Sequence, residues 1–417
     1  MPVIKIETQA IIIGAGPAGA STSIFLDKYN IPHIVIEKER FPRDKVCGDA
    51  FSTRTIHVLK QANPDWLHQI FNDNSSFMAT NGAIFIGPDG RKLHIPFGKN
   101  NLPGHAPGFT SSRLVFDKFL FDKIHSASAT VFENAAVKSI ERGNDKITID
   151  IIQGETHYQV SAPLLVGADG EKSQVKKALM PQPWRNKGHS VALRAYFKGV
   201  TGFSEASFIE LFYLTEILPG YFWIFPLPNG MANIGLGFLS DKVKKEKINL
   251  RKELMKLVHE HPIIKQRFSN ASLAGNIHGW SIPMNMQKMP ISGDHFLLAG
   301  DAGCLVNPFT GEGIGNALYS GMVAADAIKN CLQQNKFNAG FLKKCYDDIV
   351  YRDLGAELKA SAWMQRLFNN PRVFNFLVRK VHSSKTLHHA ICSMFNGTNL
   401  YSELKKPSFY GKVLLNR

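Results

Sequence analysis

The sequence predicts an α/β chain (α+β overall), in which a domain containing βαβ units is joined to a mixed or antiparallel β-sheet domain and a C-terminal helical region. Three observations support this prediction. A strand–helix–strand pattern surrounds a glycine cluster near the N-terminus, alternating apolar patterns of strand length occupy residues 187–276, and helical patterning runs from residue 338 onward. The length of 417 residues exceeds what one compact core usually spans, which favours two packed domains.

The N-terminal pattern begins with residues 9–13, a β-branched run typical of a buried parallel strand. It enters a G-x-G-x-x-G motif formed by Gly14, Gly16 and Gly19, and a helix is expected to follow to about residue 29. In this motif the first glycine permits a tight turn, the second lets the backbone approach a pyrophosphate, and the third lets helix pack on strand. A second apolar run ends at Glu37, whose carboxylate can accept a hydrogen bond from a ribose 2′-hydroxyl and would repel a 2′-phosphate. The segment therefore predicts a Rossmann-type dinucleotide site that disfavours NADP, and this motif alone does not separate FAD from NAD.

Two later segments favour FAD. Residues 164–170 read as an apolar strand that ends in a sharp turn with Asp169, and residues 296–303 read as a second strand that ends in Gly300-Asp301. The loop of residues 307–313 then precedes a helix expected over about 314–331. A carboxylate at a strand end can accept hydrogen bonds from a polyol, and glycine amides at a helix start can stabilise a delocalised anion. FAD has a ribityl polyol, and its reduced ring carries negative charge, so one cofactor explains both features.

These motifs resemble the p-hydroxybenzoate hydroxylase-like superfamily of FAD-dependent oxidoreductases, and most closely the geranylgeranyl reductase family within it. The resemblance spans roughly residues 11–328 and rests on several motifs in the same order. It implies that Arg113 lies along the cofactor, whereas the residues alone favour a helix-start arginine in a surface salt bridge. The cofactor-binding residues that the resemblance implies are Gly14, Gly16, Gly19, Glu37, Arg113, Asp169, Gly300, Asp301, Pro308, Gly311 and Gly313.

The segment Lys45-Val46-Cys47-Gly48-Asp49 resembles the cysteine–glycine loop of geranylgeranyl reductases. The resemblance implies that Cys47 lies close to the flavin and shapes the pocket, with a catalytic role as proton donor as one interpretation. A small buried thiol is the other interpretation, and it is the commoner fate of a free cysteine. A thiol of low pKa needs a cationic neighbour, and Arg43 and Lys45 are the candidates that the sequence offers.

Residues 218–226 resemble the Pro-x-x-Tyr-x-Trp-x-Phe-Pro motif of the same family, with Leu218 in place of the first proline. Alternation along a strand places Tyr221, Trp223 and Phe225 on one face, where they can form a wall for a flat or long apolar substrate. Tyr221 and Trp223 are therefore the other two candidate catalytic residues, and ordinary core packing is the alternative. Flavin halogenases carry Trp-x-Trp-x-Ile-Pro at this point, and Tyr221 replaces their first tryptophan, which argues against halogenation.

The expected FAD domain is discontinuous and comprises residues 1–77, 108–183 and 277–334. The expected substrate domain comprises residues 78–107 and 187–276, and the C-terminal helical region comprises residues 338–417. That helical region mixes aromatic and basic residues, which is typical of a helix at a membrane surface or lipid entrance. A helix packed on the FAD domain gives the same pattern and is favoured.

The composition contains 49 Lys and Arg against 34 Asp and Glu, so the formal net charge is +15. Such an excess favours nucleic acid, an anionic membrane face or phosphorylated substrates, and a solvated basic surface is the alternative. The sequence contains no recognition helix or RNA-binding signature, so no nucleic-acid partner is expected. Five cysteines without a CxxC pair argue against disulfides and a metal site. The same cysteine pattern favours a reducing compartment, so a cytoplasmic protein is expected, and the positive charge suggests peripheral contact at the inner face of the membrane. No apolar run is long enough to span a membrane.

These observations lead to one main functional hypothesis. We expect FAD-dependent reduction of a carbon–carbon double bond in an apolar isoprenoid or polyene lipid, with NAD(P)H or a small redox protein as electron donor. The main alternative is an NAD(P)H-dependent flavin monooxygenase that hydroxylates an apolar or aromatic substrate. A flavin-binding lipid carrier without catalytic activity is a third interpretation, and it leaves the glycine loop beside the ring without a purpose.

Overall fold

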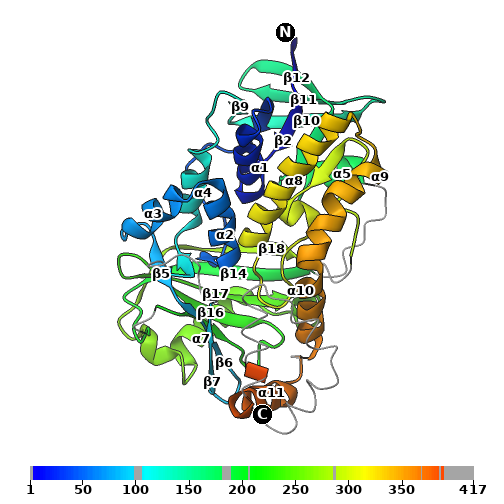
Figure 1. Ribbon diagram of the computed structural model, residues 1–417. Helices are drawn as coiled ribbons and strands as arrows, with labels where there is room; N and C mark the ends of the chain where they lie inside the picture. Colours follow the sequence, from blue (N-terminus) through cyan, green and yellow to red (C-terminus); the bar gives the residue numbers. More distant parts are fainter. Residues whose placement is uncertain are drawn as a thin grey trace.

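The structure is a computed structural model that describes residues 3–97, 106–180, 189–204, 207–284, 288–367, 369–384 and 387–388. Two sheet-based halves make up most of the molecule, with helices along one side and at the lower end in Figure 1. The predicted α/β class, with a Rossmann-type half, a mixed-sheet half and C-terminal helices, is confirmed. The stretch 389–417 of the expected helical region, including Cys392, lies outside the described residues.

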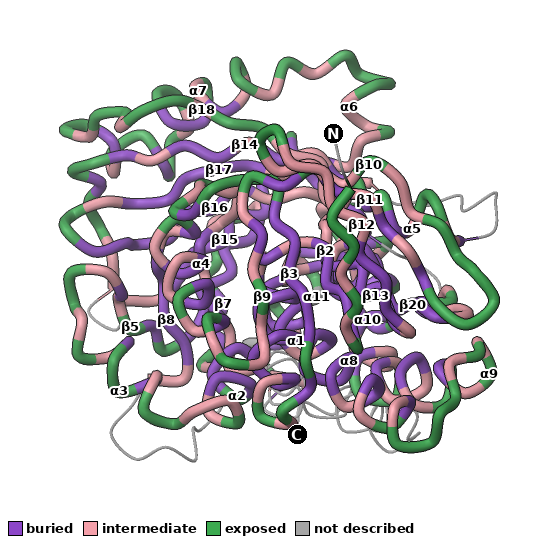
Figure 2. The backbone as a smooth tube through the Cα atoms, turned by 90° about the horizontal axis from the view of Figure 1, so that it is seen from above, coloured by how far each residue is buried: buried purple, intermediate pink, exposed green. Residues whose placement is uncertain are grey.

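The first half is built on a six-stranded sheet of order β19-β20-β13-β2-β3-β9. Its central strands are short, apolar and fully buried, as expected for a parallel sheet covered on both faces, and Figure 2 shows them as continuous purple segments. All pairs are parallel except β19 with β20. The strands are β2 (Ala10–Ile13), β3 (His33–Ile36), β9 (Ala129–Phe132), β13 (Leu164–Gly167), β19 (Ser292–Gly293) and β20 (Phe296–Leu298).

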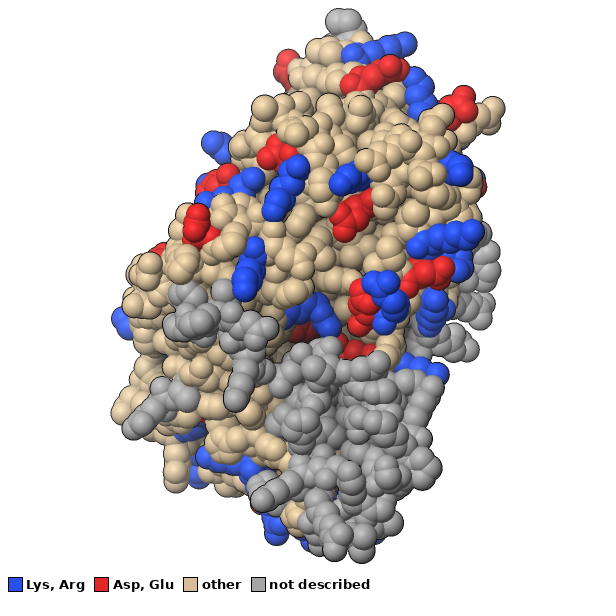
Figure 3. Space-filling model, in the orientation of Figure 1, with Lys and Arg blue, Asp and Glu red and all other residues tan. Residues whose placement is uncertain are grey.

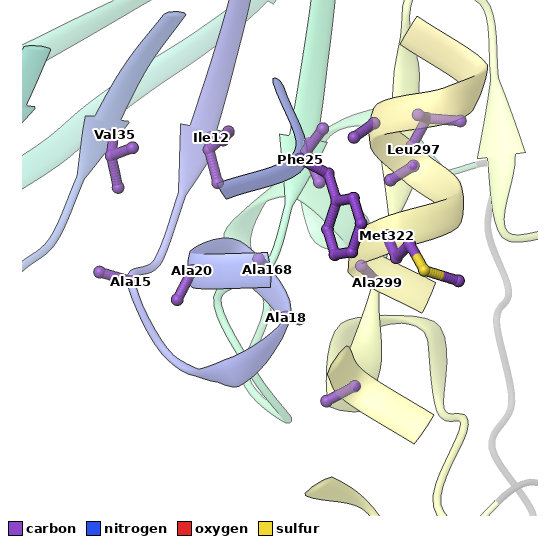
Figure 4. Packing of buried hydrophobic residues seen from close by; sticks show 14 of the residues in the cluster. Ile12, Ala15, Ala18, Ala20, Phe25, Val35, Ala168, Leu297, Ala299 and Met322 are labelled. Atoms are coloured by element: carbon purple, nitrogen blue, oxygen red, sulfur yellow. The ribbon is translucent and has the colours of Figure 1, made fainter. Parts of the chain in front are cut away.

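Two helices pack tightly against each other on this sheet, α1 (Pro17–Lys28) and α8 (Ile314–Gln334). Their close approach requires Gly321, because a Cβ there would lie 2.2 Å from the carbonyl oxygen of Ala18. The Ser21 hydroxyl also donates a hydrogen bond of 2.7 Å to the Leu318 carbonyl across the contact. Figure 4 shows small alanines around the first turn of α1, whereas Phe25 fills the space toward Met322 of α8.

Two smaller sheets and several helices complete this half. A four-stranded sheet has the order β1-β12-β11-β10, and a three-stranded sheet has the order β4-β8-β5. The strands are β1 (Val3–Glu7), β4 (Ala50–Phe51), β5 (Met78–Thr80), β8 (Gly108–Thr110), β10 (Ala135–Arg142), β11 (Ile147–Gln153) and β12 (Thr156–Ala162). The helices are α2 (Thr53–Ala62), α3 (Asp65–Asn72), α4 (Arg113–Phe121) and α5 (Gln174–Leu179).

The second half is a seven-stranded mixed sheet of order β18-β14-β17-β16-β15-β6-β7. It joins residues from both segments of the expected substrate domain, since β6 pairs in parallel with β15. Strand β18 stays paired with β14 as far as Pro283, which is past the expected boundary at residue 276. The strands are β6 (Gly82–Ile86), β7 (Lys92–Pro96), β14 (His189–Lys198), β15 (Ile209–Phe212), β16 (Tyr221–Leu227), β17 (Met231–Leu239) and β18 (Ser272–Pro283).

The two faces of this sheet have different partners. Phe222 and Ile224 of β16 face the core that contains α7 (Leu250–Glu260), which follows the short helix α6 (Ser240–Glu246). Trp223 and Phe225 point to the opposite face, where α11 (Pro371–Ser383) packs through Phe374 and its neighbours. Alternation along β16 therefore separates a structural face from the face that carries the site.

The C-terminal helices connect the two halves. Helices α9 (Ala339–Leu342) and α10 (Asp348–Leu367) flank a π-helical turn at Lys343–Asp347, and Val350 and Leu354 of α10 belong to the core of the FAD-side half. Helix α11 instead packs on the seven-stranded sheet at the lower end of Figure 1. The expectation that the C-terminal helices pack on the FAD domain is thus confirmed for α10. It is wrong for α11, because the apolar face of that helix packs against the seven-stranded sheet.

Charged side chains are interspersed on the face shown in Figure 3, with blue and red groups alternating over its upper part. Some ion pairs of the described residues join exposed groups, such as Lys118 with Asp122 and Lys146 with Glu7. In the described part of the chain, no helix is both long enough and apolar enough to cross a bilayer.

Candidate active site

One continuous cavity of about 890 Å³ is lined by residues of both halves of the molecule. This volume lies in the range of cofactor and ligand sites, roughly 300–1,000 Å³. On the side of the six-stranded sheet the lining is glycine-rich and charged, with the loops after β2, β3 and β13. On the side of the seven-stranded sheet it is apolar. We call this part the apolar chamber, and it is lined by Ala83, Phe85, Phe97, Ile209, Leu211, Tyr221, Trp223 and Phe225.

The glycine loop has the geometry that a dinucleotide site requires. Gly14 has φ +97°, and a Cβ there would lie 2.4 Å from the Ala168 carbonyl oxygen, so only glycine fits the turn. Gly16 faces the cavity, and the nearest atom to a Cβ at that position is Nη2 of Arg43 at 3.4 Å. Gly19 does not line the cavity, because its role is packing: a Cβ there would lie 1.8 Å from the Gly14 carbonyl oxygen. The tight turn at Gly14 and the close packing at Gly19 are therefore found as expected, and Gly16 lies on the cavity wall, where its contact with a pyrophosphate stays a prediction.

Glu37 follows β3 and is buried, with both carboxylate oxygens engaged by the main chain. Oε2 accepts a hydrogen bond of 2.8 Å from the Ala15 N–H, and Oε1 accepts one of 3.0 Å from the Glu39 N–H. These bonds hold the carboxylate at the cavity wall beside the glycine loop. Each carboxylate oxygen keeps a second lone pair, so Glu37 can still accept a ribose hydroxyl.

Arg113 begins α4 and forms a buried ion pair. Its Nε and Nη2 donate bonds of 2.6 and 2.7 Å to the two oxygens of Asp117, and Arg43 Nη1 donates a further bond of 2.9 Å. Burial opposes ionisation of Asp117, but the two guanidinium groups outweigh it and lower the pKa of that carboxyl. The surface salt bridge expected from the residues alone is wrong, because both side chains are buried and Arg113 lines the cavity.

The two acidic residues at the other strand ends differ in their surroundings. Asp169 accepts hydrogen bonds of 2.6 and 3.3 Å from the N–H groups of Gln174 and Val175, so one of its oxygens caps α5. Asp301 lies 3.7 Å from Nζ of Lys45, and both line the cavity. Both carboxylates line the cavity, and Asp169 is also engaged by the α5 N-terminus, so Asp301 stays the predicted contact for a ribityl polyol.

The loop before α8 meets the expectation only in part. Residues 310–314 line the cavity, including Gly311 and Gly313. The Gly311 N–H, however, donates a hydrogen bond of 2.9 Å to the Asn307 carbonyl. This amide was expected to face an anion, but it is already engaged within the loop. Pro308 is buried behind the loop, where its carbonyl accepts a bond of 2.6 Å from Gln365.

Gly300 is also set back from the cavity. A Cβ at Gly300 would lie 3.1 Å from the Ala317 Cβ and 3.2 Å from the Ala18 Cβ, so the residue serves the packing of α1 and α8. Neither Pro308 nor Gly300 is part of the cavity wall, so the structure does not bring these two predicted cofactor-binding residues to the cavity with the others. Their neighbours Thr310 and Asp301 take the places facing the cavity.

Cys47 is half-buried and lies on the cavity wall between the charged part and the apolar chamber. Burial raises the pKa of its thiol, and the Arg113 guanidinium acts in the opposite direction. The cation that acts on Cys47 is therefore Arg113, not Arg43 or Lys45 as the sequence suggested. Arg43 is engaged by Asp117, and Lys45 lies 4.7 Å from the centre of the Trp280 ring as well as near Asp301.

Tyr221, Trp223 and Phe225 form one aromatic wall, as alternation along the strand predicted. Tyr221 and Trp223 pack edge to face with ring centroids 6.0 Å apart, and Trp223 and Phe225 follow at 6.2 Å. The Tyr221 hydroxyl donates a hydrogen bond to the Thr310 carbonyl, which ties the wall to the loop before α8. Burial raises the pKa of Tyr221, so its hydroxyl remains protonated at neutral pH.

Sequence reasoning missed a buried polar network behind this wall. The Trp223 Nε1–H donates a bond of 2.8 Å to Asn233 Oδ1, and Asn233 Nδ2 donates to the Cys47 carbonyl and to Asp49 Oδ2, each at 2.8 Å. The Tyr196 hydroxyl donates a further bond of 2.7 Å to Asp49 Oδ2. In the sequence, Asn233 could have indicated this network, because it is a polar residue within an otherwise apolar strand. Its hydrogen-bond partners could not have been predicted, because they come from segments far apart in the chain.

The residues of the charged part fit FAD. The N–H groups in the first turn of α1 have no intrahelical partners, and Gly16, Pro17 and Ala18 of that turn face the cavity. A pyrophosphate there would meet the positive end of the helix and the Arg43 guanidinium together. Glu37 would then accept the ribose hydroxyl, Asp301 the ribityl chain, and the loop of residues 310–313 would lie along the ring.

The comparisons with known proteins agree with this geometry. The family model described as an FAD binding domain matches residues 7–334. A digeranylgeranylglycerophospholipid reductase of Thermoplasma volcanium is 27% identical over 347 residues, which cover 82% of this chain and 83% of that protein. A menaquinone reductase of Mycobacterium tuberculosis is 26% identical over 328 residues, covering 77% of this chain and 76% of that protein.

Among solved structures, a geranylgeranyl bacteriochlorophyll reductase-like protein from Thermoplasma acidophilum superposes with a TM-score of 0.81 at 21% identity, covering 99% of this chain and 100% of that chain. A flavin-dependent brominase superposes with a TM-score of 0.78, also at 21% identity, covering 98% of each chain. At these identities the likeness shows a shared fold.

Proposed function

Because the chain belongs to the FAD-binding domain family and is an FAD-dependent oxidoreductase, we propose that it reduces carbon–carbon double bonds in an apolar isoprenoid or polyene lipid. The observation that carries the proposal is the continuity of the cavity. One space joins the dinucleotide loop to an apolar chamber walled by aromatic rings, with Cys47 at the junction. A substrate that enters the chamber therefore reaches the position where the reactive ring would lie.

The relatives support the substrate class. Proteins named for the reduction of a digeranylgeranyl lipid and of menaquinone cover about three quarters or more of this chain. Both names denote molecules with long polyprenyl chains. The apolar chamber suits such a chain, since aliphatic and aromatic side chains line it on the sheet face.

Each site residue has a defined task in this proposal. When bound and reduced, FAD supplies a hydride to one carbon of the double bond. Tyr221, Trp223 and Phe225 hold the apolar chain flat against the wall, and the chamber excludes water. Cys47 holds the proton for the second carbon, because burial keeps its thiol protonated at neutral pH by raising its pKa.

An anaerobic turnover experiment tests the proposal. Purified protein, reconstituted with FAD and reduced chemically, is incubated with a lipid extract, and the products are analysed by mass spectrometry. A gain of two hydrogens per double bond supports reduction. A gain of one oxygen that requires air identifies a monooxygenase, and unaltered lipids with no ligand-dependent flavin reoxidation identify a carrier.

The electron donor and the membrane contact belong to the same proposal. NAD(P)H or a small redox protein delivers the electrons, and a cytoplasmic protein takes its substrate from the membrane face through the C-terminal helices. Trp363 of α10 and Phe376 of α11 are each 54% exposed, and the exposed Arg366, Arg372 and Arg379 belong to the same two helices. Sedimentation with anionic vesicles, compared with neutral vesicles, tests the contact.

A further inference from the structure

Asp49 is a buried carboxyl group that the functions described so far do not use. It is fully buried, lines the cavity, and has a left-handed backbone with φ +63°. Oδ2 accepts hydrogen bonds from Asn233 and Tyr196, whereas Oδ1 has no hydrogen-bond partner among the described residues. A left-handed conformation is uncommon for a residue other than glycine, so the fold holds this carboxyl in place at some energetic cost.

The surroundings of Asp49 favour a carboxyl that exchanges a proton near neutral pH. Burial raises its pKa from 3.8 to about 6, although the hydrogen bonds of Tyr196 and Asn233 and the charges of Arg194 and Arg113 act in the opposite direction. An ordinary aspartate at the surface would be ionised throughout the physiological range. Asp49 is therefore suited to hold and release a proton, and its unpartnered Oδ1 is the free acceptor position.

A route to solvent leads from Asp49 through Tyr196. The Tyr196 side chain is only half-buried, and its hydroxyl contacts Asp49 Oδ2 at 2.7 Å. The Arg194 guanidinium lies 4.2 Å from the centre of the Tyr196 ring and forms an ion pair of 2.5 Å with Asp44, which is exposed. The phenol and the carboxyl thus form a chain that begins near the surface and ends inside the cavity.

Asp49 is also coupled to Cys47. The Asn233 amide group donates to the Cys47 carbonyl and to Asp49 Oδ2, which fixes the two residues relative to each other. Burial is the main cause of the raised pKa of the Cys47 thiol. The Asp49 charge raises this pKa further, whereas the Asp49 main-chain N–H and Arg113 lower it. A proton on Asp49 therefore has a nearby acceptor once Cys47 has lost its own.

We propose that Asp49 is the group that returns a proton to Cys47 after each reduction, with Tyr196 as the inlet from solvent. The assignment rests on the function proposed above. The alkene gains a hydride, and with it two electrons, from reduced FAD, and one proton from the Cys47 thiol. The thiolate takes the Asp49 proton. Asp49 is then reprotonated from solvent through the Tyr196 hydroxyl, which accepts a proton from water as it passes its own to the carboxylate, so that no free phenolate forms. No residue changes its net protonation over the cycle, so the second hydrogen of the product originates from solvent.

The first test uses the protein without cofactor and measures the Cys47 thiol directly. Alkylation of Cys47 by iodoacetamide is followed against pH by peptide mass spectrometry in wild type and Asp49→Asn. Asparagine keeps the oxygen that accepts from Asn233 and Tyr196 and removes only the charge. We expect the Cys47 pKa to fall in the variant, with an alkylation rate about tenfold higher at neutral pH if the shift is about one unit. Identical pH profiles would overturn the coupling.

Two controls accompany this measurement. Asp145→Asn removes an equivalent charge from the exposed turn between β10 and β11 and should leave the Cys47 profile unchanged. Cys345, which lies in the π-helical turn, is quantified in the same digests and reports any general loosening of the fold. A change at both cysteines would indicate disruption and would overturn the specific coupling.

The second test uses the FAD-loaded enzyme. Asp49→Asn and Tyr196→Phe should bind FAD and accept electrons as wild type does, yet turn over at least about 100-fold more slowly, the lower range for loss of a positioned acid. Their turnover should also show a larger solvent deuterium isotope effect. Wild-type turnover in Asp49→Asn would overturn the proposal. If the wild-type protein reduced no double bond, the proposed function would be wrong. The alkylation profiles would still show whether Asp49 shifts the pKa of the Cys47 thiol.

Discussion

Removing the charge of Asp49 should make the protein more stable at neutral pH. The folded-state pKa of Asp49 is raised from 3.8 to about 6, chiefly by burial. A carboxyl whose pKa is raised favours the folded state when it is protonated, so wild type loses stability as the pH rises from about 4 through about 6. Each pKa unit corresponds to about 1.4 kcal/mol, so the penalty reaches about 3 kcal/mol at neutral pH and above.

Asp49→Asn isolates this contribution because asparagine does not titrate. Urea unfolding of the apoprotein at about pH 4 and about pH 8 gives the free energy of unfolding of each variant at each pH. Titrating groups that do not interact with Asp49 contribute equally to both proteins, and Cys47 and Tyr196, which do interact with it, have raised pKa values and stay largely protonated up to about pH 8. We expect the free energy of unfolding of Asp49→Asn minus that of wild type to be about 2–3 kcal/mol larger at about pH 8 than at about pH 4. If this difference in the free energy of unfolding were the same at both pH values, Asp49 would not have a raised pKa in the folded protein, and the proposed proton route would be refuted.

Three further variants test the site. Asp301→Ala should lose flavin while the fold is retained, because a hydrogen bond to a charged group contributes about 1.5–3 kcal/mol; wild-type flavin content would place the ribityl contact elsewhere. Trp223→Ala should lower the free energy of unfolding by roughly 3–5 kcal/mol, since the ring is buried against Gly235, and should weaken substrate binding more than FAD binding. Cys47→Ser should keep FAD and accept electrons but reduce substrate far more slowly, because a hydroxyl is a weaker acid than a thiol; unchanged turnover would leave Cys47 as a pocket residue.

The parts of the site that the sequence predicts are those encoded by short-range spacing. Gly14, Gly16 and Gly19 take their expected places because a tight turn and a close helix contact depend on residues next to each other in the chain. The wall of Tyr221, Trp223 and Phe225 follows in the same way from strand alternation. Arg113 and Asp117 are spaced for an ion pair along a helix, but only the packing of the two halves shows that this pair is buried.

Long-range contacts explain what the sequence does not predict. Asp49 obtains its character from Asn233 and Tyr196, which reach it from two neighbouring strands of the other half. Pro308 lies in the predicted loop yet faces away from the cavity, since Gln365 of α10 binds its carbonyl. Such partners depend on how the two sheets dock, and a motif carries no information about that arrangement.

Anaerobic reoxidation of the reduced, protein-bound flavin tests the central claim most directly. The reduced protein is mixed in a stopped-flow instrument with a polyprenyl lipid, or with its fully saturated counterpart, and the flavin absorbance is followed without oxygen. The account predicts that the unsaturated lipid reoxidises the flavin with a rate that saturates with lipid concentration, while the saturated lipid has no effect. Flavin that stays reduced with both lipids and reoxidises only when oxygen is admitted would contradict double-bond reduction.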